Sequence, residues 1–252
     1  MHHAPSPNLR RALAGALLAL TSLLPAEAVA TASCQSQSGA NQALLLELYT
    51  SEGCNSCPPA DRWLSSLKPQ GPVLAAAFHV DYWDRLGWVD RFGSPRHTER
   101  QAQSQRQNGA RFSYTPQVVA NGRDWRGWPT LPSMNAQAQL RLALTRQDAQ
   151  QVQLSVTPLA GAPAQLGLWW ALLEDGHVSQ VKSGENQGAS LHHDHVVRFY
   201  RSEPDWAGSV GLARSWRLAA SASGEQGRPV RLLVVVTDAS TGAPLQALQL
   251  AC

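Results

Sequence analysis

Charge is scarce in this chain of 252 residues. Asp, Glu, Lys and Arg together make up 15% of the sequence, and the formal net charge at pH 7 is +3. No block of Lys and Arg stands out after the first residues. The sequence therefore indicates neither a nucleic-acid partner nor an anionic membrane surface. Hydrophobic residues make up 43%, which is enough for a sizeable core.

Long hydrophobic runs are also missing after the N-terminus. The apolar run over residues 13–24 is too short to span a bilayer comfortably, and it lies between Arg10-Arg11 and Pro25. Small residues that follow offer cleavage patterns, and this order is typical of an export signal. We predict that residues 1–33 are a signal peptide, with an uncleaved anchor or a lipid-modified Cys34 as alternatives. The mature protein is then expected to be periplasmic or secreted, with no membrane contact.

Cysteine is rare, and its placement is informative. The four cysteines are Cys34, Cys54, Cys57 and Cys252. Disulfides form and persist outside the cytosol. Because the two ends of a domain often lie close together, we predict a structural disulfide between Cys34 and Cys252. Free or differently paired thiols are the alternative.

Strand and helix patterns alternate up to about residue 150. Strands are predicted over residues 43–49, 73–80 and 117–120, because these runs are compact and apolar. Helices are predicted over residues 58–67, 95–108 and 131–147. This order predicts an α/β domain, a mixed sheet with helices on its faces, over residues 34–150.

Helical periodicity disappears after residue 150. Short apolar runs separated by turn residues cover residues 151–157, 166–173, 178–182, 195–201, 210–218, 230–237 and 245–250. Runs at this spacing predict a small antiparallel β-sandwich over residues 151–252.

The motif that carries chemistry is Cys54-Asn55-Ser56-Cys57, between a predicted strand and a predicted helix. A thiolate at a helix N-terminus faces unsatisfied N–H groups and the positive end of the helix dipole, so its pKa falls. A second cysteine three residues later can attack a mixed disulfide and release the partner. We therefore predict a thioredoxin-like domain with Cys54 and Cys57 as the catalytic redox pair. Cys54 is expected to be the exposed nucleophile.

A proline precedes the strand predicted over residues 117–120. In thioredoxin-like folds a cis-proline opens the strand that faces the cysteine pair and exposes the preceding backbone to a bound peptide. A cis bond is plausible only before proline. We predict a cis bond between Thr115 and Pro116 and a role for both residues in substrate binding. An ordinary trans-proline at a strand edge is the alternative.

Polar and aromatic residues follow the strand predicted over residues 73–80. Asp81, Trp83 and Asp84 are expected at the same edge of the sheet as the cysteine pair, where they could line the substrate groove. A carboxylate there could accept a proton from Cys57. The alternative is that these carboxylates cap a loop while the aromatic rings pack.

These motifs together resemble an exported bacterial family of unknown function with a thioredoxin-like fold. The resemblance rests on the segments Glu47-Leu-Tyr-Thr-Ser-Glu-Gly-Cys-Asn-Ser-Cys-Pro-Pro-Ala-Asp61, Val80-Asp-Tyr-Trp-Asp84, Tyr114-Thr-Pro-Gln-Val-Val-Ala-Asn-Gly122, Gly184-Glu-Asn186, His193-Asp194 and Val196-Val-Arg198. It covers nearly the whole mature chain and implies the fold and an exported location. It supplies no reaction and no substrate.

Three functional hypotheses follow. The first is a thiol–disulfide oxidoreductase without a cofactor, acting on exported proteins that carry thiols or disulfides and served by a redox partner protein. The second is a non-catalytic binding or structural protein with an inert Cys54–Cys57 disulfide. The third is a metal-handling protein in which His79 joins the cysteines to bind copper or zinc. His193 and His195 could also share a strand face, but no further ligand is evident, and no metal site is predicted.

Overall fold

The structure is a computed structural model that describes residues 1–4, 34–67, 72–148, 150–218 and 225–251. The chain divides into two units, Met1–Ala32 and Ser33–Cys252. Residues 1–4 of the first unit form neither helix nor strand. Most of the predicted signal peptide, and Cys252 of the predicted terminal disulfide, lie outside the described residues. Everything below concerns the second unit.

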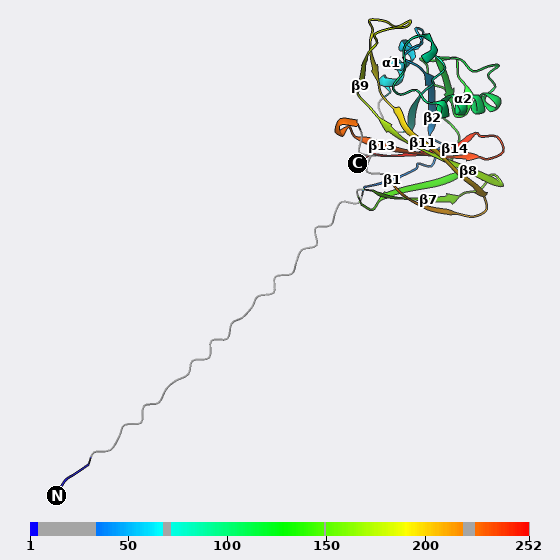
Figure 1. The fold of residues 1–252 in the computed structure, drawn as a ribbon. Coiled ribbons are helices and arrows are strands. Elements are labelled where there is room, and N and C mark those ends of the chain that lie inside the picture. The colour runs from blue at the N-terminus through cyan, green and yellow to red at the C-terminus, as the bar shows by residue number, and fades with distance from the viewer. Residues whose placement is uncertain (5–33, 68–71, 149, 219–224, 252) are drawn as a thin grey trace. The chain divides into compact units, whose positions relative to one another are not determined.

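A mixed sheet of eight strands runs through this unit, and it combines strands from both halves of the chain (Figure 1). In spatial order the strands are β14 (Pro244–Ala251), β13 (Val230–Asp238), β8 (Gln165–Glu174), β11 (Val196–Ala207), β3 (Val73–His79), β2 (Leu44–Thr50), β4 (Gln117–Ala120) and β5 (Arg123–Asp124). The halves join where β11 lies parallel to β3, with Val196 opposite Ala77. The sheet therefore continues across the predicted boundary at residue 150.

A second, antiparallel sheet has four strands. Their spatial order is β1 (Gln35–Gln37), β6 (Leu140–Arg146), β7 (Gln151–Pro158) and β12 (Leu212–Arg217). A separate hairpin consists of β9 (His177–Gln180) and β10 (Ser190–His193). Figure 1 shows β1 and β7 below the long sheet, and β9 near helix α1 at the opposite end of the unit.

Two α-helices and two short 3-10 helices complete the described elements. Helix α1 (Pro58–Ser66) starts with two prolines, whose missing N–H groups would have no partner in a first turn anyway. Helix α2 (Pro95–Asn108) begins after Ser94, whose side chain accepts a hydrogen bond from the Arg96 N–H, and ends at Gly109. The 3-10 helices are η1 (Asp84–Leu86) and η3 (Glu225–Gly227). Neither α-helix is long and apolar enough to cross a membrane.

Side-chain alternation gives the long sheet two buried faces. Leu44, Leu46 and Leu48 of β2 point to one face, where α1 packs with Ala60 and Leu64. On β8, Leu168, Trp170 and Leu172 pack against the four-stranded sheet. The opposite face joins both halves in a single cluster, which contains Leu45, Tyr49, Phe78, Val119, Trp169, Leu173, Leu233 and Val235 among its members.

The prediction of a thioredoxin-like α/β domain followed by a separate β-sandwich is wrong. The described residues are mostly strand, with two α-helices, and two large sheets share one hydrophobic interior. The strands of the second half do not close a sandwich among themselves. They extend the first-half sheet, because β8 and β13 are apolar on both faces and so must be covered on both.

The helix predicted over residues 131–147 is also wrong. Residues 140–146 form β6, in which Leu140, Leu142 and Leu144 are fully buried while Arg141 is exposed. A spacing of two places all three leucines on one face of a strand and would spread them around a helix. Residues 131–136 have no regular structure.

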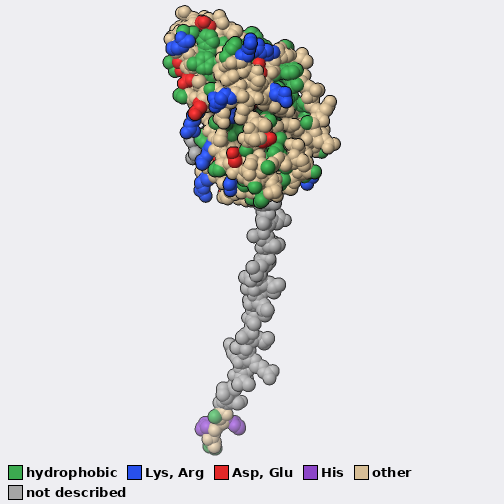
Figure 2. All heavy atoms as spheres, turned by 90° about the vertical axis from the view of Figure 1, so that its right-hand side faces the viewer, with side chains coloured by type: hydrophobic (Ala, Val, Ile, Leu, Met, Phe, Trp, Pro, Cys, Tyr) green, Lys and Arg blue, Asp and Glu red, His purple; other side chains and the backbone are tan. Residues whose placement is uncertain are grey.

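The surface on the α2 side carries dispersed charge. Figure 2 shows Lys and Arg side chains spread over this face among neutral ones, with a few acidic side chains between them. No single patch of one sign dominates the face in that view.

Candidate functional site

The cysteine pair lies in the turn between β2 and α1. Cys54 and Cys57 form a disulfide. The Cys54 N–H donates to Ser51 O, and the Cys57 N–H donates to Cys54 O, so two successive tight turns bring the chain from strand to helix. Cys57 is the N-cap of α1, and the Ser56 hydroxyl lies 3.4 Å from Cys54 Sγ.

Both cysteines are fully buried, with 0% of their surface exposed. Cys54 is therefore not solvent-facing in this structure, in contrast to the expectation from the sequence. Asn55 and Ser56 between them are exposed. Any reagent that reaches the sulfur atoms must first displace what covers them.

Part of the cover is the tip of the β9–β10 hairpin. The Asn186 side-chain amide donates to two backbone carbonyls of the cysteine turn, Glu52 O at 2.9 Å and Cys54 O at 3.0 Å. The Asn55 N–H donates to the Glu185 carboxylate at 3.3 Å. A further bond joins the Ser183 hydroxyl to Gly87 O at 2.5 Å. These polar contacts fasten the hairpin tip to the cysteine turn and to the loop after β3.

Trp83 packs closely against the cysteine turn at Gly53. A Cβ at Gly53 would lie 3.0 Å from Trp83 Cβ, so the absence of a side chain at Gly53 allows this close approach. The Trp83 indole N–H donates to the Thr115 hydroxyl at 2.8 Å. The structure thus connects two of the predicted groove residues beside the cysteine turn. The Thr115–Pro116 bond is cis, as predicted.

Asp81 and Asp84, the other predicted groove residues, hold loops. The Asp81 carboxylate accepts a hydrogen bond from the Thr98 hydroxyl at 2.5 Å. The Asp84 carboxylate accepts from the Asp90 N–H at 3.1 Å. These contacts correspond to the loop-capping alternative, and neither carboxylate has a bond to the cysteine turn.

Buried carboxylates and histidines lie around the cysteine turn and form an acid–base cluster. Its members are Glu52, Asp61, His79, Asp90 and His193, and each is at most 7% exposed. His79 Nδ1 lies 2.7 Å from Asp90 Oδ2, and His193 Nε2 lies 3.4 Å from Glu52 Oε1. The rings of the two histidines are 4.9 Å apart between centroids. The elements that supply these residues are the turn after β2, α1, β3, the loop before α2, and β10.

Pairing sets the charge states in this cluster. Burial opposes ionisation of Asp90, but the adjoining His79 lowers the pKa of the Asp90 carboxyl to about 2. Burial likewise disfavours charge on His79, but the Asp90 carboxylate outweighs it and raises the pKa of the imidazole. Asp61 differs, since burial dominates there and raises the pKa of its carboxyl. Asp61 is therefore the carboxylate of the cluster most readily protonated near neutral pH.

The sequence prediction did not include this cluster as a site. Glu52 and Asp61 are parts of a sequence motif there, His79 is a metal-ligand candidate, and His193 is both. A signal was present, because Glu52, His79 and His193 are polar residues beside or within apolar strands, where an unpaired charge would be costly. Asp90 carries no such signal, since it lies in a loop outside the predicted strands and helices.

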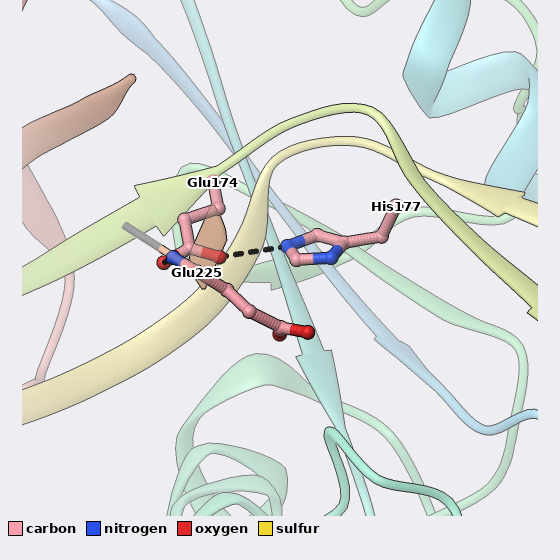
Figure 3. A group of neighbouring side chains, drawn as sticks. All are labelled: Glu174, His177 and Glu225. Carbon is pink, nitrogen blue, oxygen red and sulfur yellow. Dashed lines mark hydrogen bonds and ion pairs between the residues drawn. The ribbon is translucent and has the colours of Figure 1, made fainter. Parts of the chain in front are cut away.

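Metal binding is not supported around the cysteines. Among the described residues, one group of potential metal ligands has its ligand atoms within 4.8 Å of one another. It consists of Glu174, His177 and Glu225 and includes neither cysteine (Figure 3). His177 is paired with Glu174 at 2.8 Å, and Glu225 pairs with Arg91 at 2.9 Å. Since Arg198 also lies within 3.6 Å of both carboxylates, arginines already neutralise this group. We therefore assign it to ion pairing.

Cys34 lies beside the C-terminal strand. Its Sγ is 3.6 Å from the carbonyl oxygen of Ala251, the residue before Cys252. The predicted Cys34–Cys252 disulfide remains a prediction, because Cys252 is outside the described residues.

Comparison with known proteins identifies the family and the fold. No match was found among curated proteins. A crystal structure of an Agrobacterium tumefaciens protein is similar at 23% identity and a TM-score of 0.62, over 84% of this chain and 96% of that one. HBP35 of Porphyromonas gingivalis is similar at 15% identity and a TM-score of 0.55, over 84% of this chain and 75% of that one. At these identities the likeness concerns the fold alone. A model of proteins of unknown function matches residues 45–237, and the chain therefore belongs to the DUF1223 family.

Proposed function

We propose that this protein is a thiol–disulfide oxidoreductase that exchanges its Cys54–Cys57 disulfide with thiols of exported proteins. One observation carries the proposal: the disulfide lies at the start of α1, next to a buried acid–base cluster. Disulfide exchange requires deprotonation of the attacking thiol and protonation of the thiolate that leaves. Groups able to make both transfers lie in the same buried region as the sulfur atoms.

A purely structural role for this disulfide is less favourable. Cys54 and Cys57 are three positions apart, so the bridge closes a very short loop. The chain-entropy model assigns such a bridge roughly 2 kcal/mol, against about 5 kcal/mol for a loop of 100 residues. A structural bridge also has no need of a cluster of costly buried ionisable groups beside it.

The reaction begins when a substrate thiolate attacks one sulfur of the disulfide. If it attacks Cys54 Sγ, a substrate–Cys54 disulfide forms and Cys57 leaves as a thiolate, which is then protonated. A second thiolate of the substrate then attacks the substrate sulfur that is bonded to Cys54. A disulfide forms within the substrate, and Cys54 leaves as a thiolate. The substrate is oxidised to a disulfide, and the protein gains two electrons and two protons. A redox partner protein must then reoxidise the Cys54–Cys57 dithiol. In the reaction itself, the Ser56 hydroxyl lies where it can donate a hydrogen bond to the Cys54 thiolate.

Substrate access requires the hairpin tip to move. The contacts of Asn186 and Glu185 with the cysteine turn are a few hydrogen bonds, each contributing about 0.5–1.5 kcal/mol net. Opening at this cost is ordinary for binding loops. The export-signal pattern of residues 1–33 supports an extracytoplasmic location, where substrates with exposed thiols and disulfides occur.

Trapping of mixed disulfides tests the proposal. We expect a Cys57→Ala protein to accumulate mixed disulfides through Cys54, because the second thiol that would release the substrate is missing. A Cys54→Ala protein serves as the matched control and should accumulate none. The measurement is non-reducing electrophoresis with mass spectrometry after each variant is incubated with an exported protein that carries disulfides, so that the Cys54 thiolate bonds to one substrate sulfur and displaces the other as a thiolate.

Two outcomes would contradict this assignment. Trapping through Cys57 alone would reverse the roles of the two cysteines. No trapping in either variant, together with a reduction potential below about −300 mV, would identify the bridge as an inert structural disulfide.

A further inference from the structure

We infer that Asp61 is the residue that accepts the proton of the Cys57 thiol when Cys57 attacks the mixed disulfide at Cys54. This inference rests on the proposed function and names the proton acceptor for the reverse exchange, in which Cys57 displaces the substrate and closes the disulfide again. The sequence pointed to Asp81 or Asp84 for that task, but both carboxylates are bound in loops.

Asp61 is placed for this by the helix that both residues share. Cys57 is the N-cap of α1, and Asp61 follows four positions later, with its N–H donating to Cys57 O at 3.1 Å. Residues four apart lie on the same face of a helix, so the two side chains are neighbours. Both are buried, Cys57 at 0% and Asp61 at 7% exposure. The buried Cys57 thiol therefore has little access to water as a proton acceptor.

The first turn of α1 makes such an acceptor necessary. Pro58 and Pro59 occupy its first two positions and have no N–H to offer a thiolate. The N–H groups of Ala60 and Asp61 both donate to Cys57 O. The cap therefore supplies little hydrogen bonding to the Cys57 sulfur, and a neighbouring base must favour its deprotonation.

Asp61 also has the fewest described hydrogen bonds and ion pairs among the three carboxylates of the cluster. Asp90 is bound to His79 and accepts the N–H groups of Glu52 and Phe92. Glu52 accepts the Trp88 indole N–H and pairs with His193. The described hydrogen bond of the Asp61 carboxylate is a single one, from the Thr50 hydroxyl at 3.1 Å.

Charged groups on every side bear on the ionisation of Asp61. The facing groups are His193 on β10 and His79 on β3, which favour the carboxylate, and Asp90 in the loop before α2, which opposes it; Thr50 at the end of β2 adds its hydroxyl. Burial is the strongest influence and raises the pKa of the carboxyl. A raised pKa makes the carboxylate a stronger base and therefore a better acceptor for the proton of a thiol.

The step conserves atoms and electrons. The Cys57 thiol gives its proton to the Asp61 carboxylate, which becomes a carboxylic acid. The Cys57 sulfur then attacks Cys54 Sγ, the bond between Cys54 and the substrate sulfur breaks, and the substrate leaves as a thiolate. The Cys57 sulfur is oxidised from the thiol to the disulfide level, the substrate sulfur is reduced from the disulfide to the thiolate level, and Cys54 stays at the disulfide level.

A two-stage reaction with an aromatic disulfide, 5,5′-dithiobis(2-nitrobenzoate), separates the steps. In the reduced Cys34→Ala/Cys252→Ala protein, which is the background for every variant of this test, reaction at Cys54 releases one equivalent of thionitrobenzoate, and attack by Cys57 releases a second. In Asp61→Asn, we expect the first release to keep its rate and the second to slow by at least 10-fold at pH 7. The rise of the second rate with pH should no longer follow deprotonation of Asp61 and should follow ionisation of the Cys57 thiol instead.

Two further variants keep the test decisive. Asp81→Asn at the same sheet edge is the matched control and should leave both stages unchanged. Thr50→Val keeps the Asp61 carboxylate but removes its hydrogen bond, so the pH profile of the second stage should shift upward without loss of amplitude. A second stage in Asp61→Asn with wild-type rate and pH profile would overturn the inference, while absence of the first stage in the wild type would instead refute the proposed function.

Discussion

Asp90 is the residue that holds the acid–base cluster together. It binds His79 at 2.7 Å, accepts the N–H groups of Glu52 and Phe92, and is 2% exposed. Because its pKa is about 2 when folded, its pairing stabilises the protein above the unfolded pKa of roughly 4, and this contribution is lost as the pH falls toward 2. His79 has a raised pKa, so its contribution is complete below roughly pH 6.5 and is lost as the pH rises through the folded value.

We expect Asp90→Asn to lower the free energy of unfolding by about 3–5 kcal/mol, because it leaves a buried imidazole without its carboxylate. The loss should be greatest between roughly pH 4 and pH 6.5, where both partners are charged. Urea unfolding at pH 2.5, 5.5 and 9 measures it. Arg201→Ala, which removes an exposed partner of Glu203, is the control and should cost at most about 1 kcal/mol. An equal loss at all three pH values would show that the pair is not ionic.

The β9–β10 hairpin is the element whose position decides access to the disulfide. Asn186→Ala removes two hydrogen bonds between its tip and the cysteine turn. At about 0.5–1.5 kcal/mol for each bond, the open population should rise roughly 5- to 140-fold. Reduction of the Cys54–Cys57 disulfide by dithiothreitol should accelerate by the same factor, measured by quenched alkylation and mass spectrometry. Gln180→Ala removes a hydrogen bond to Ser190 within the same hairpin and should leave the rate unchanged. An unchanged rate in Asn186→Ala would mean that access is limited elsewhere.

Elements were more predictable from the sequence than their assembly. The helices predicted over residues 58–67 and 95–108 are observed as α1 and α2, because proline marks the start of each and Gly109 marks the end of α2. The strand predicted over residues 117–120 is β4. Strands β1 and β10 carried no apolar pattern, since Gln35–Gln37 is polar and β10 contains two histidines. The contact between the β9–β10 hairpin tip and the cysteine turn could not be predicted from the sequence. It consists of side-chain hydrogen bonds to backbone carbonyls, which depend on how distant segments are placed in the folded structure.

At the scale of the whole molecule, both halves of the chain share one interior. The cluster on the α2 side contains Leu45 and Phe78 from the first half and Trp169, Leu173 and Val235 from the second. We therefore expect residues 34–150 alone to remain unfolded, because they lose these partners and leave β3 without its neighbour β11. The full chain should unfold in a single transition, with circular dichroism and tryptophan fluorescence changing together in urea. Cooperative folding of the isolated fragment would contradict this.

The two-domain prediction failed for a physical reason. Both halves contain apolar strands of the right length, and such strands pair equally well within a half or across the two. Local pattern does not distinguish these pairings. The deciding contacts, such as Ala77 N–H to His195 O at 2.8 Å, join residues far apart in the sequence. The cysteine pair was predictable because its residues are adjacent, whereas the acid–base cluster draws on both halves.

The parallel pairing of β3 with β11 has a consequence for how the chain reaches its folded state. During synthesis β3 must wait for its partner, because β11 lies far later in the sequence and is made long after β3. Until it arrives, β3 presents an unpaired edge that is open to strands of other chains. Contacts of such long sequence separation also slow folding. A newly made chain is therefore prone to aggregate until β11 has paired with β3, however stable the folded protein is. The yield of folded protein should fall as the concentration of newly made chains rises.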